Sequence, residues 1–219
     1  ASGRIMPEPR GVVLIVSTWN YPFSLALEPV IGAIAAGNGV VLKLSPTAQS
    51  TASVVTRILK AVFPANELAI ANAELPELLN LRFDAIFFTG GGETGKVVAQ
   101  AAARTLTPVT LELGGKSPCI VDETADIGWS ARRIVWGKFL NAGQSCVAPD
   151  FLLVQKSVKD KLMIAIRQSI REFYGDNPQE SRDYGRIINK FHFDRLAAML
   201  SEGRLIAGGE SSPDDLYIA

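Results

Sequence analysis

Cys146 is the side chain whose surroundings best fit covalent chemistry. It lies in the segment 141–150, which reads NAGQSCVAPD and directly follows a predicted helix. Small and polar neighbours leave a thiol accessible, and an accessible thiol can act as a nucleophile. Because free cysteines are often simply buried, composition alone does not decide between a nucleophile and a structural thiol.

The other cysteine and the only histidine are predicted to be structural. Cys119 lies in the apolar strand segment 118–121, PCIV, which is typical of a small core residue. His192 lies in a helix-like segment, KFHF at 190–193. A Cys–His hydrolase would need this histidine beside Cys146, so we disfavour that class of enzyme. One histidine and two cysteines are also too few for a usual metal site, and none is predicted.

A glycine-rich segment, GGGETG at 90–95, follows a predicted strand and precedes a predicted helix. Gly90, Gly92 and Gly95 fit the pattern G-x-G-x-x-G, in which glycines let the backbone approach a phosphate. The following helix N-terminus favours negative charge. The alternative is a tight strand-to-helix turn without a ligand. The candidate cofactor-binding residues here are Gly90, Gly91, Gly92, Glu93, Thr94 and Gly95.

Glu112 lies in LELGG at 111–115 and has three interpretations. An acid about 20 residues beyond a dinucleotide-binding glycine loop can bind the ribose hydroxyls. A carboxylate at a strand end in a cleft, desolvated and with a raised pKa, can instead act as a general base. A buried carboxylate with satisfied hydrogen bonds is the third interpretation. Spacing alone does not choose among them.

Alternating strands and helices must position these residues. Short apolar runs predict strands at 11–16, 40–44, 68–71 and 85–88. Periodicity and stop signals predict helices at 23–36, 50–63, 76–81 and 95–103. This order predicts right-handed βαβ units and an α/β fold whose parallel sheet is covered on both faces.

The organisation changes near residue 112. Only GGKSP separates two further predicted strands, so no helix fits between them. We therefore divide the chain into domains at 1–111 and 112–219. The elements predicted from there on are strands at 109–113, 119–121 and 151–154, helices at 127–141, 156–174 and 189–202, and the entry to a strand at 216–219.

The composition excludes several classes of protein. Lysine plus arginine and aspartate plus glutamate number 22 each, so net charge favours neither nucleic acid nor an anionic membrane as a partner. No apolar run approaches the 18 residues of a membrane span. The first ten residues lack the apolar centre of a signal peptide. Two cysteines make no disulfide framework, so we expect a reducing, cytoplasmic location.

Five segments in this order resemble the aldehyde dehydrogenase superfamily. They are TWNYPF at 18–23, VLK at 41–43, GGGETG at 90–95, LELGGKSP at 111–118 and GQSC at 143–146. Details such as WNYPF, LTPVTLE, WGKF and CVAPD resemble its class 3 branch, which acts on fatty and aromatic aldehydes. The resemblance runs from about residue 9 to 219, and its Glu and Cys motifs are highly specific in combination.

The resemblance implies a role for each matching residue. Cys146 would attack the aldehyde carbonyl, and Asn20 with the Cys146 backbone N–H would stabilise the resulting oxyanion. Glu112 would activate the water that hydrolyses the thioester, which favours its interpretation as a base. Lys43 would bind the ribose of NAD or NADP. A Rossmann-like cofactor domain would precede the start of a second α/β domain, the catalytic one.

Three departures from the family pattern matter. Gly91 and Gly92 replace the usual Ser and Thr of the loop, which removes a hydroxyl donor. Pro46 stands where many NAD-preferring members carry a Glu, so we expect NADP to be tolerated as well as NAD. Family members are also considerably longer. We therefore expect a central fragment that lacks both ends, exposes apolar faces and has little activity alone.

Two rival functions stay open. The chain could be a truncated, inactive cofactor-binding fragment, or a CoA-acylating relative in which a thiol replaces water. Such relatives generally lack the glutamate base, so Glu112 favours hydrolysis. The expected partners are a small aldehyde and, at full length, a second copy in a homodimer. Nucleic acid is not expected, and membrane contact is expected only through a tail absent here.

Overall fold

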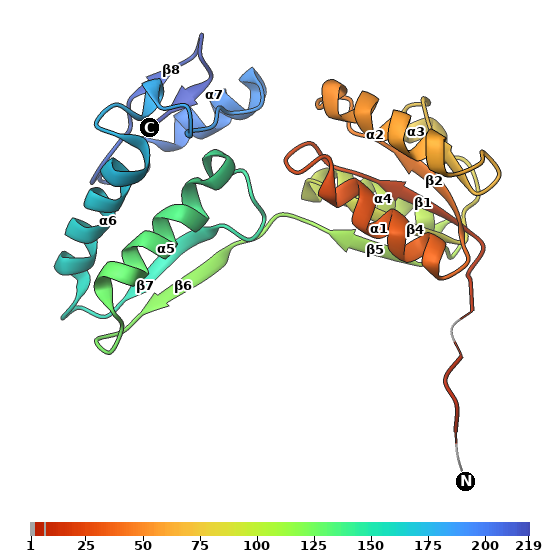
Figure 1. Ribbon diagram of the computed structural model, residues 1–219, viewed down its shortest axis with the longest axis horizontal. Coiled ribbons are helices and arrows are strands. Elements are labelled where there is room, and N and C mark those ends of the chain that lie inside the picture. The colour runs from red at the N-terminus through yellow and green to blue at the C-terminus, as the bar shows by residue number, and fades with distance from the viewer. Residues whose placement is uncertain (1–2, 7) are drawn as a thin grey trace. The chain divides into compact units, whose positions relative to one another are not determined.

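The structure is a computed structural model that describes residues 3–6 and 8–219. The chain forms two compact units, which we call unit 1, ending at Gly114, and unit 2, beginning at Gly115 (Figure 1). The sequence predicted a division after residue 111, near this boundary. Each unit has its own sheet and its own apolar core.

Unit 1 is built on a five-stranded sheet in which every neighbouring pair of strands is parallel. Its strands are β1 (Val12–Val16), β2 (Gly39–Lys43), β3 (Leu68–Ile70), β4 (Ala85–Thr89) and β5 (Val109–Glu112). Its helices are α1 (Ser24–Ala35), α2 (Gln49–Val62), α3 (Leu75–Leu78) and α4 (Gly92–Ala103). The predicted α/β class with a parallel, Rossmann-like sheet is therefore confirmed.

The residues of β1 point alternately to the two faces of the sheet. Val13 and Ile15 pack into a core with α1 and α2. Leu14 and Val16 pack into a second core with α3 and α4. Burial of each such side chain stabilises the fold by about 1.5–3 kcal/mol. Because both faces are covered, the strand reads as the continuous apolar run VVLIV instead of an alternating pattern.

The strand order β3-β2-β1-β4-β5 reverses direction at β1. After β1, the chain adds β2 and β3 on one side of that strand. It then crosses back, and β4 pairs with β1 on the other side. The connections after β1 and β4 therefore diverge to opposite faces of the sheet. In α/β folds, such a reversal opens a crevice at the carboxyl ends of the strands, where ligands bind.

Unit 2 begins with two parallel strands that pack one face against two helices. The elements are β6 (Ser117–Val121), α5 (Ile127–Phe139), the 3-10 turn η1 (Leu140–Gly143), β7 (Pro149–Val154), α6 (Lys159–Tyr174), the 3-10 turn η2 (Pro178–Glu180), α7 (Lys190–Met199), β8 (Ser211–Ser212) and β9 (Tyr217–Ile218). Strands β8 and β9 form an antiparallel pair. In the described part of the chain, no helix combines the length and the apolar character that crossing a membrane requires.

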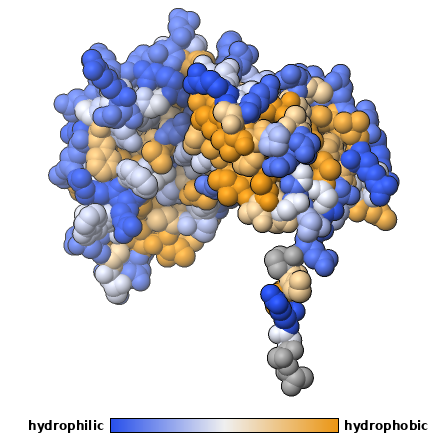
Figure 2. All heavy atoms as spheres, turned by 45° about the vertical axis from the view of Figure 1, so that its right-hand side comes forward, coloured by the Kyte–Doolittle hydropathy of each residue, from blue (hydrophilic) through white to orange (hydrophobic). Residues whose placement is uncertain are grey.

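One face of the β6–β7 sheet is apolar but exposed. Val121 packs with Leu162 into the core beneath α5 and α6. On the other face, Ile120, Phe151 and Leu153 are exposed. Figure 2 shows apolar residues gathered in patches on the face of the molecule that it draws. Exposed apolar faces of this kind promote association.

Several predicted helix boundaries were wrong; for example, the helices predicted at 76–81 and 189–202 are the shorter α3 and α7. Helix α4 begins at Gly92 instead of Gly95. The negative charge of Glu93 in its first turn is stabilised by the positive end of the helix dipole, and its carboxylate forms a 2.8 Å ion pair with Lys96. Helix α5 ends at Phe139, before a turn with left-handed backbone. Helix α6 begins at Lys159 instead of Lys156, after a turn closed by a backbone hydrogen bond from Val158 to Gln155.

Candidate active site

A pocket of about 330 Å³ lies at the carboxyl ends of β1, β2 and β4. It is lined by the residues that end each strand and begin the next loop, at 16–19, 43–46 and 88–91, together with Glu74, Leu75 and Thr94. The pocket is therefore at the reversal of strand order, where an α/β sheet binds its ligands.

Lys43 is the last residue of β2 and lines this pocket. Its carbonyl oxygen accepts a hydrogen bond of 2.9 Å from the backbone N–H of Ser17, which joins the ends of β1 and β2. Only 9% of Lys43 is exposed, and it makes no ion pair with any residue that the structure describes. A lysine that lines a pocket can donate hydrogen bonds to a bound molecule, so the site fits a ligand rich in oxygen atoms or negative charge.

Ser17, a pocket residue that sequence reasoning missed, supports the same conclusion. It is 6% exposed, and its buried hydroxyl oxygen has no hydrogen-bond partner among the residues that the structure describes. The sequence could have indicated this residue, because Ser17 is the first polar residue after the apolar run of β1. The polyhydroxylated, anionic character of NAD or NADP fits a pocket that is lined by this hydroxyl group and by Lys43.

The glycine loop only partly lines the pocket. Gly90, Gly91 and Thr94 line it, whereas Gly92, Glu93 and Gly95 do not. Glu93 is exposed and pairs with Lys96 instead.

Packing within unit 1 explains two of these glycines. A Cβ atom on Gly90 would lie 2.6 Å from the Phe88 ring, and one on Gly95 would lie 2.8 Å from the Leu113 side chain. A Cβ atom on Gly91 or on Gly92 would meet nothing within 4 Å. The fingerprint spacing at Gly90 and Gly95 therefore reflects close packing as well as any ligand.

Glu112 ends β5 at the same edge of the sheet. Its carbonyl oxygen accepts a hydrogen bond of 3.0 Å from the backbone N–H of Gly90. Its side chain is exposed, so our expectation of a desolvated carboxylate is corrected: no described neighbour covers it.

Asn20 is half-buried and follows β1. The parallel sheet thus brings Asn20, Lys43, the start of the glycine loop and Glu112 to one edge, although they are far apart in sequence.

Cys146 belongs to unit 2, in the loop between η1 and β7, and it is exposed. Its carbonyl oxygen accepts a hydrogen bond of 3.4 Å from the Ser117 hydroxyl. A Cβ atom on Gly115 would collide with the same carbonyl group. The backbone of Cys146 is therefore packed against the start of β6, while the residue stays open to solvent.

Cys119 and His192 have structural surroundings. Cys119 is half-buried in β6 and packs against the core of unit 2. His192 lies in the first turn of α7, and burial lowers its pKa below the ordinary 6.5, assisted by the charge of Arg195. Among the described residues, no group of three or more His, Cys, Asp or Glu side chains is arranged to hold a metal ion.

Sequence and structure comparisons agree on the family. The model of the aldehyde dehydrogenase family matches residues 2–216. The chain is 47% identical over 98% of its length to aldehyde dehydrogenase family 3 member A2 of Macaca fascicularis, covering 45% of that protein. It is 50% identical over 98% of its length to 4,4'-diaponeurosporen-aldehyde dehydrogenase of Staphylococcus aureus (strain NCTC 8325 / PS 47), covering 48% of it.

A solved structure of substrate-bound AldH from Staphylococcus aureus superimposes on the chain with a TM-score of 0.90 and 49% identity. The match covers 97% of this chain and 47% of that one. The chain thus spans about half the length of the relatives that it matches. The family 3 relatives also confirm the predicted class 3 resemblance. Motifs, parallel sheet and comparisons lead to one conclusion: the chain belongs to the aldehyde dehydrogenase family.

Proposed function

We propose that this chain carries the thiol and the cofactor-binding elements of an enzyme that oxidises aldehydes to carboxylic acids with NAD or NADP. Unit 1 would be part of the cofactor-binding domain, and unit 2 part of the catalytic domain. The observation that carries the proposal is the exposed Cys146, whose backbone is held by Gly115 and Ser117. A nucleophilic residue must be accessible to its substrate, and a fixed main chain gives its side chain a defined position.

The chemistry begins at the Cys146 sulfur. Attack of the thiolate on the aldehyde carbonyl forms a carbon–sulfur bond and places negative charge on the former carbonyl oxygen. The Asn20 side-chain amide and the Cys146 backbone N–H would donate hydrogen bonds to that oxygen. Loss of one such donor typically lowers the rate about 10²–10³-fold.

The Glu112 carboxylate would act as the general base. Its exposed side chain can contact water, and a carboxylate that accepts a proton from water generates the nucleophile that hydrolyses the thioester. Hydrolysis releases the carboxylic acid and returns the thiol to Cys146. This role distinguishes the proposal from a CoA-acylating enzyme, in which an external thiol takes the acyl group.

The cofactor would occupy the pocket at the ends of β1, β2 and β4. Lys43 would bind the ribose hydroxyls, and Ser17 and the loop residues Gly90, Gly91 and Thr94 line the space around them. When bound, the nicotinamide ring supplies the acceptor for the hydride that the thiohemiacetal carbon must lose. The name of a 45% identical Canis lupus familiaris relative, "Aldehyde dehydrogenase, dimeric NADP-preferring", supports both NADP use and a homodimer.

The proposed substrates are fatty or aromatic aldehydes. Val147 directly follows the thiol residue and is 77% exposed, which provides apolar surface beside the reacting group. A bacterial relative that is 49% identical is named 4,4'-diapolycopene-4,4'-dial dehydrogenase. A cytoplasmic location stays a prediction.

The second candidate function is cofactor binding without turnover. It is favoured by one observation, that the chain spans about half the length of its relatives. In that case the chain binds NADH but does not oxidise aldehydes. The complete catalytic activity then belongs to a longer protein that contains these residues.

The test compares Cys146→Ser with Cys119→Ser in the full chain. We expect iodoacetamide to modify Cys146 faster than Cys119, and aldehyde-dependent NADH formation, where present, to be lost only in Cys146→Ser. Preferential modification of Cys119 would refute the assignment of the nucleophile. NADH binding without any NADH formation from an aldehyde would support the second candidate.

A further inference from the structure

The turn before Cys146 has an unusual backbone. Asn141, Ala142 and Gly143 have φ angles of 54°, 52° and 76°, so three consecutive residues adopt the left-handed conformation. Glycine adopts it freely, whereas alanine does not. Such a backbone persists only where its surroundings hold it, and strained segments of this kind concentrate at functional sites.

The side chain of Gln144 holds this turn. Its Nε2 donates hydrogen bonds to the carbonyl oxygens of Asn141, at 3.0 Å, and Arg186, at 2.9 Å. Its Oε1 accepts a hydrogen bond of 2.9 Å from the backbone N–H of Ile188. One half-buried carboxamide therefore joins the turn to the segment 186–188, which lies about forty residues further along the chain.

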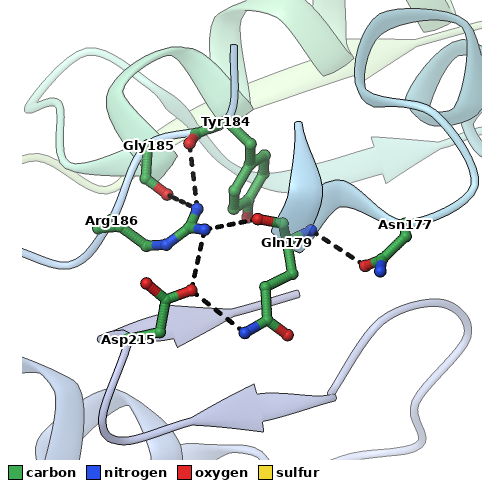
Figure 3. Close-up of polar contacts among 6 residues, drawn as sticks. All are labelled: Asn177, Gln179, Tyr184, Gly185, Arg186 and Asp215. Atoms are coloured by element: carbon green, nitrogen blue, oxygen red, sulfur yellow. Dashed lines mark hydrogen bonds and ion pairs between the residues drawn. The ribbon is translucent and has the colours of Figure 1, made fainter. Parts of the chain in front are cut away.

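The segment that Gln144 contacts is itself anchored. The Arg186 guanidinium group donates a hydrogen bond of 2.6 Å to the carbonyl oxygen of Gln179 and forms a 2.9 Å ion pair with Asp215 (Figure 3). The guanidinium carbon also lies over the ring of Tyr217, 5.2 Å from the ring centroid. Figure 3 shows Gln179 and Asp215 approaching Arg186 from separate parts of unit 2.

Gly185 lets this anchored segment approach the turn. A Cβ atom there would lie 3.3 Å from the backbone nitrogen of Ala142 and 3.4 Å from the carbonyl carbon of Asn141. On its other side, Cys146 is held by Ser117 and by the close approach of Gly115. The main chain around the thiol is thus fixed from both sides, and the sulfur-bearing residue remains exposed.

We propose that Gln144 is a positioning residue for Cys146. By holding the left-handed turn against residues 186–188, it fixes the direction of the Cys146 backbone N–H and side chain. The proposal rests on the proposed function, in which that N–H stabilises the oxyanion formed by attack of the thiol. Removal of the Gln144 hydrogen bonds would leave the thiol present and accessible, but misaligned with the Cys146 backbone N–H that stabilises the oxyanion.

The experiment uses two variants and a matched control in the full chain. Gln144→Glu keeps the acceptor for Ile188 but replaces the two donors by an oxygen that faces two carbonyl groups. Gln144→Met removes all three hydrogen bonds at similar length. Gln155→Glu is the control, because Gln155 also makes two amide hydrogen bonds, both with Glu123, beyond the other end of β7.

Two reagents separate positioning from accessibility. A nitrophenyl ester acylates a thiolate: the carbon–sulfur bond forms through an oxyanion, and nitrophenolate leaves. Iodoacetamide alkylates the same thiolate without an oxyanion, with iodide as the leaving group. We expect both Gln144 variants to slow acylation of Cys146 about 10- to 100-fold while alkylation changes less than about threefold. The control should change neither rate.

Amide hydrogen exchange gives an independent readout. We expect the amides of residues 145–147 to exchange about 10-fold faster in both Gln144 variants, and that of Ile188 only in Gln144→Met. Equal slowing of acylation and alkylation, or unchanged exchange at 145–147, would overturn the proposal. If unaltered Cys146 is acylated no faster than Cys119, the proposed function fails instead, and exchange alone decides whether Gln144 orders the turn.

Discussion

The backbone N–H of Gly90 donates a hydrogen bond of 3.0 Å to the carbonyl oxygen of Glu112. This bond continues the pairing of β4 with β5 by one residue, so the first residue of the glycine loop and the candidate base are held at the same end of neighbouring strands. A disturbance of Gly90 should therefore be felt at both the pocket and the base.

Gly90→Ala should destabilise unit 1. The new Cβ atom would lie 2.6 Å from the ring of Phe88, which is only 3% exposed and cannot move freely. Overpacking of this kind typically lowers the free energy of unfolding by about 1–3 kcal/mol. Gly91→Ser is the control, since that position is open and precedes α4, where serine is a good N-cap; we expect a change below about 0.5 kcal/mol. Urea denaturation of each variant measures the difference, and equal stabilities would contradict the packing explanation.

Lys43→Met should weaken NADH binding without loss of stability. Lys43 makes no ion pair with any described residue, and methionine keeps an unbranched side chain of similar length, so the free energy of unfolding should change little. Hydrogen bonds to charged groups contribute about 1.5–3 kcal/mol, so affinity for NADH should fall about 10-fold or more. Fluorescence titration and thermal unfolding measure the two effects. Unchanged affinity would remove Lys43 from the proposed cofactor site.

The proline at position 46 leads us to expect that the chain binds NADPH as well as NADH. Pro46 lines the pocket, and no carboxylate stands at this position to repel a 2′-phosphate. We expect the two affinities to differ by less than about 100-fold, or about 2.7 kcal/mol, and Pro46→Glu to shift the ratio toward NADH by about 10-fold or more. Glu74 also lines the pocket, so Glu74→Gln tests whether that carboxylate opposes NADPH instead. A strong NADH preference that Glu74→Gln leaves intact would contradict the prediction.

Asp215 should stabilise unit 2 at neutral pH and lose this effect in acid. Hydrogen bonds from Arg186 and Gln179 lower the pKa of Asp215 below its ordinary 3.8. Since the folded pKa is the lower one, the stabilisation is present above pH 3.8 and is lost as the pH falls through the folded value. In Asp215→Asn, the free energy of unfolding should therefore decrease less as the pH falls below neutral, so the acid limb of its pH dependence becomes flatter. Asp194→Asn, in an exposed pair with Lys190, is the control and should leave that limb unchanged.

Tyr184 should make unit 2 sensitive to alkali. Burial, together with neighbouring Tyr217 and Tyr174, raises the pKa of Tyr184 from 10.0 to about 12. Because the folded pKa is the higher one, the stabilisation is complete below pH 10.0 and is lost as the pH rises toward about 12. In Tyr184→Phe, the free energy of unfolding should fall less between pH 10 and about pH 12. The substitution also removes the 3.0 Å hydrogen bond from the Tyr184 hydroxyl to the Ile218 carbonyl oxygen. An unchanged alkaline unfolding curve would refute the assignment.

The sequence by itself determined the elements and the fold class. Apolar runs such as 12–16 and helical periodicity such as 50–63 are local properties, because they reflect which face of each element is buried. The alternation of these elements limits the topology to a parallel sheet. The small and polar neighbours of Cys146 also predicted its exposure correctly, and its motif predicted the family.

Only the tertiary structure decided how distant residues meet. Nothing in the local pattern indicates that Gly90 faces Phe88, that the Ser17 hydroxyl lacks a partner in the described part of the chain, or that the Glu112 side chain stays exposed. The sequence likewise predicts a helix that continues to Asn141, whereas a left-handed turn begins at that residue and is joined through Gln144 to residues 186–188. Such contacts depend on packing between segments far apart in the chain, and neither periodicity nor spacing encodes that packing.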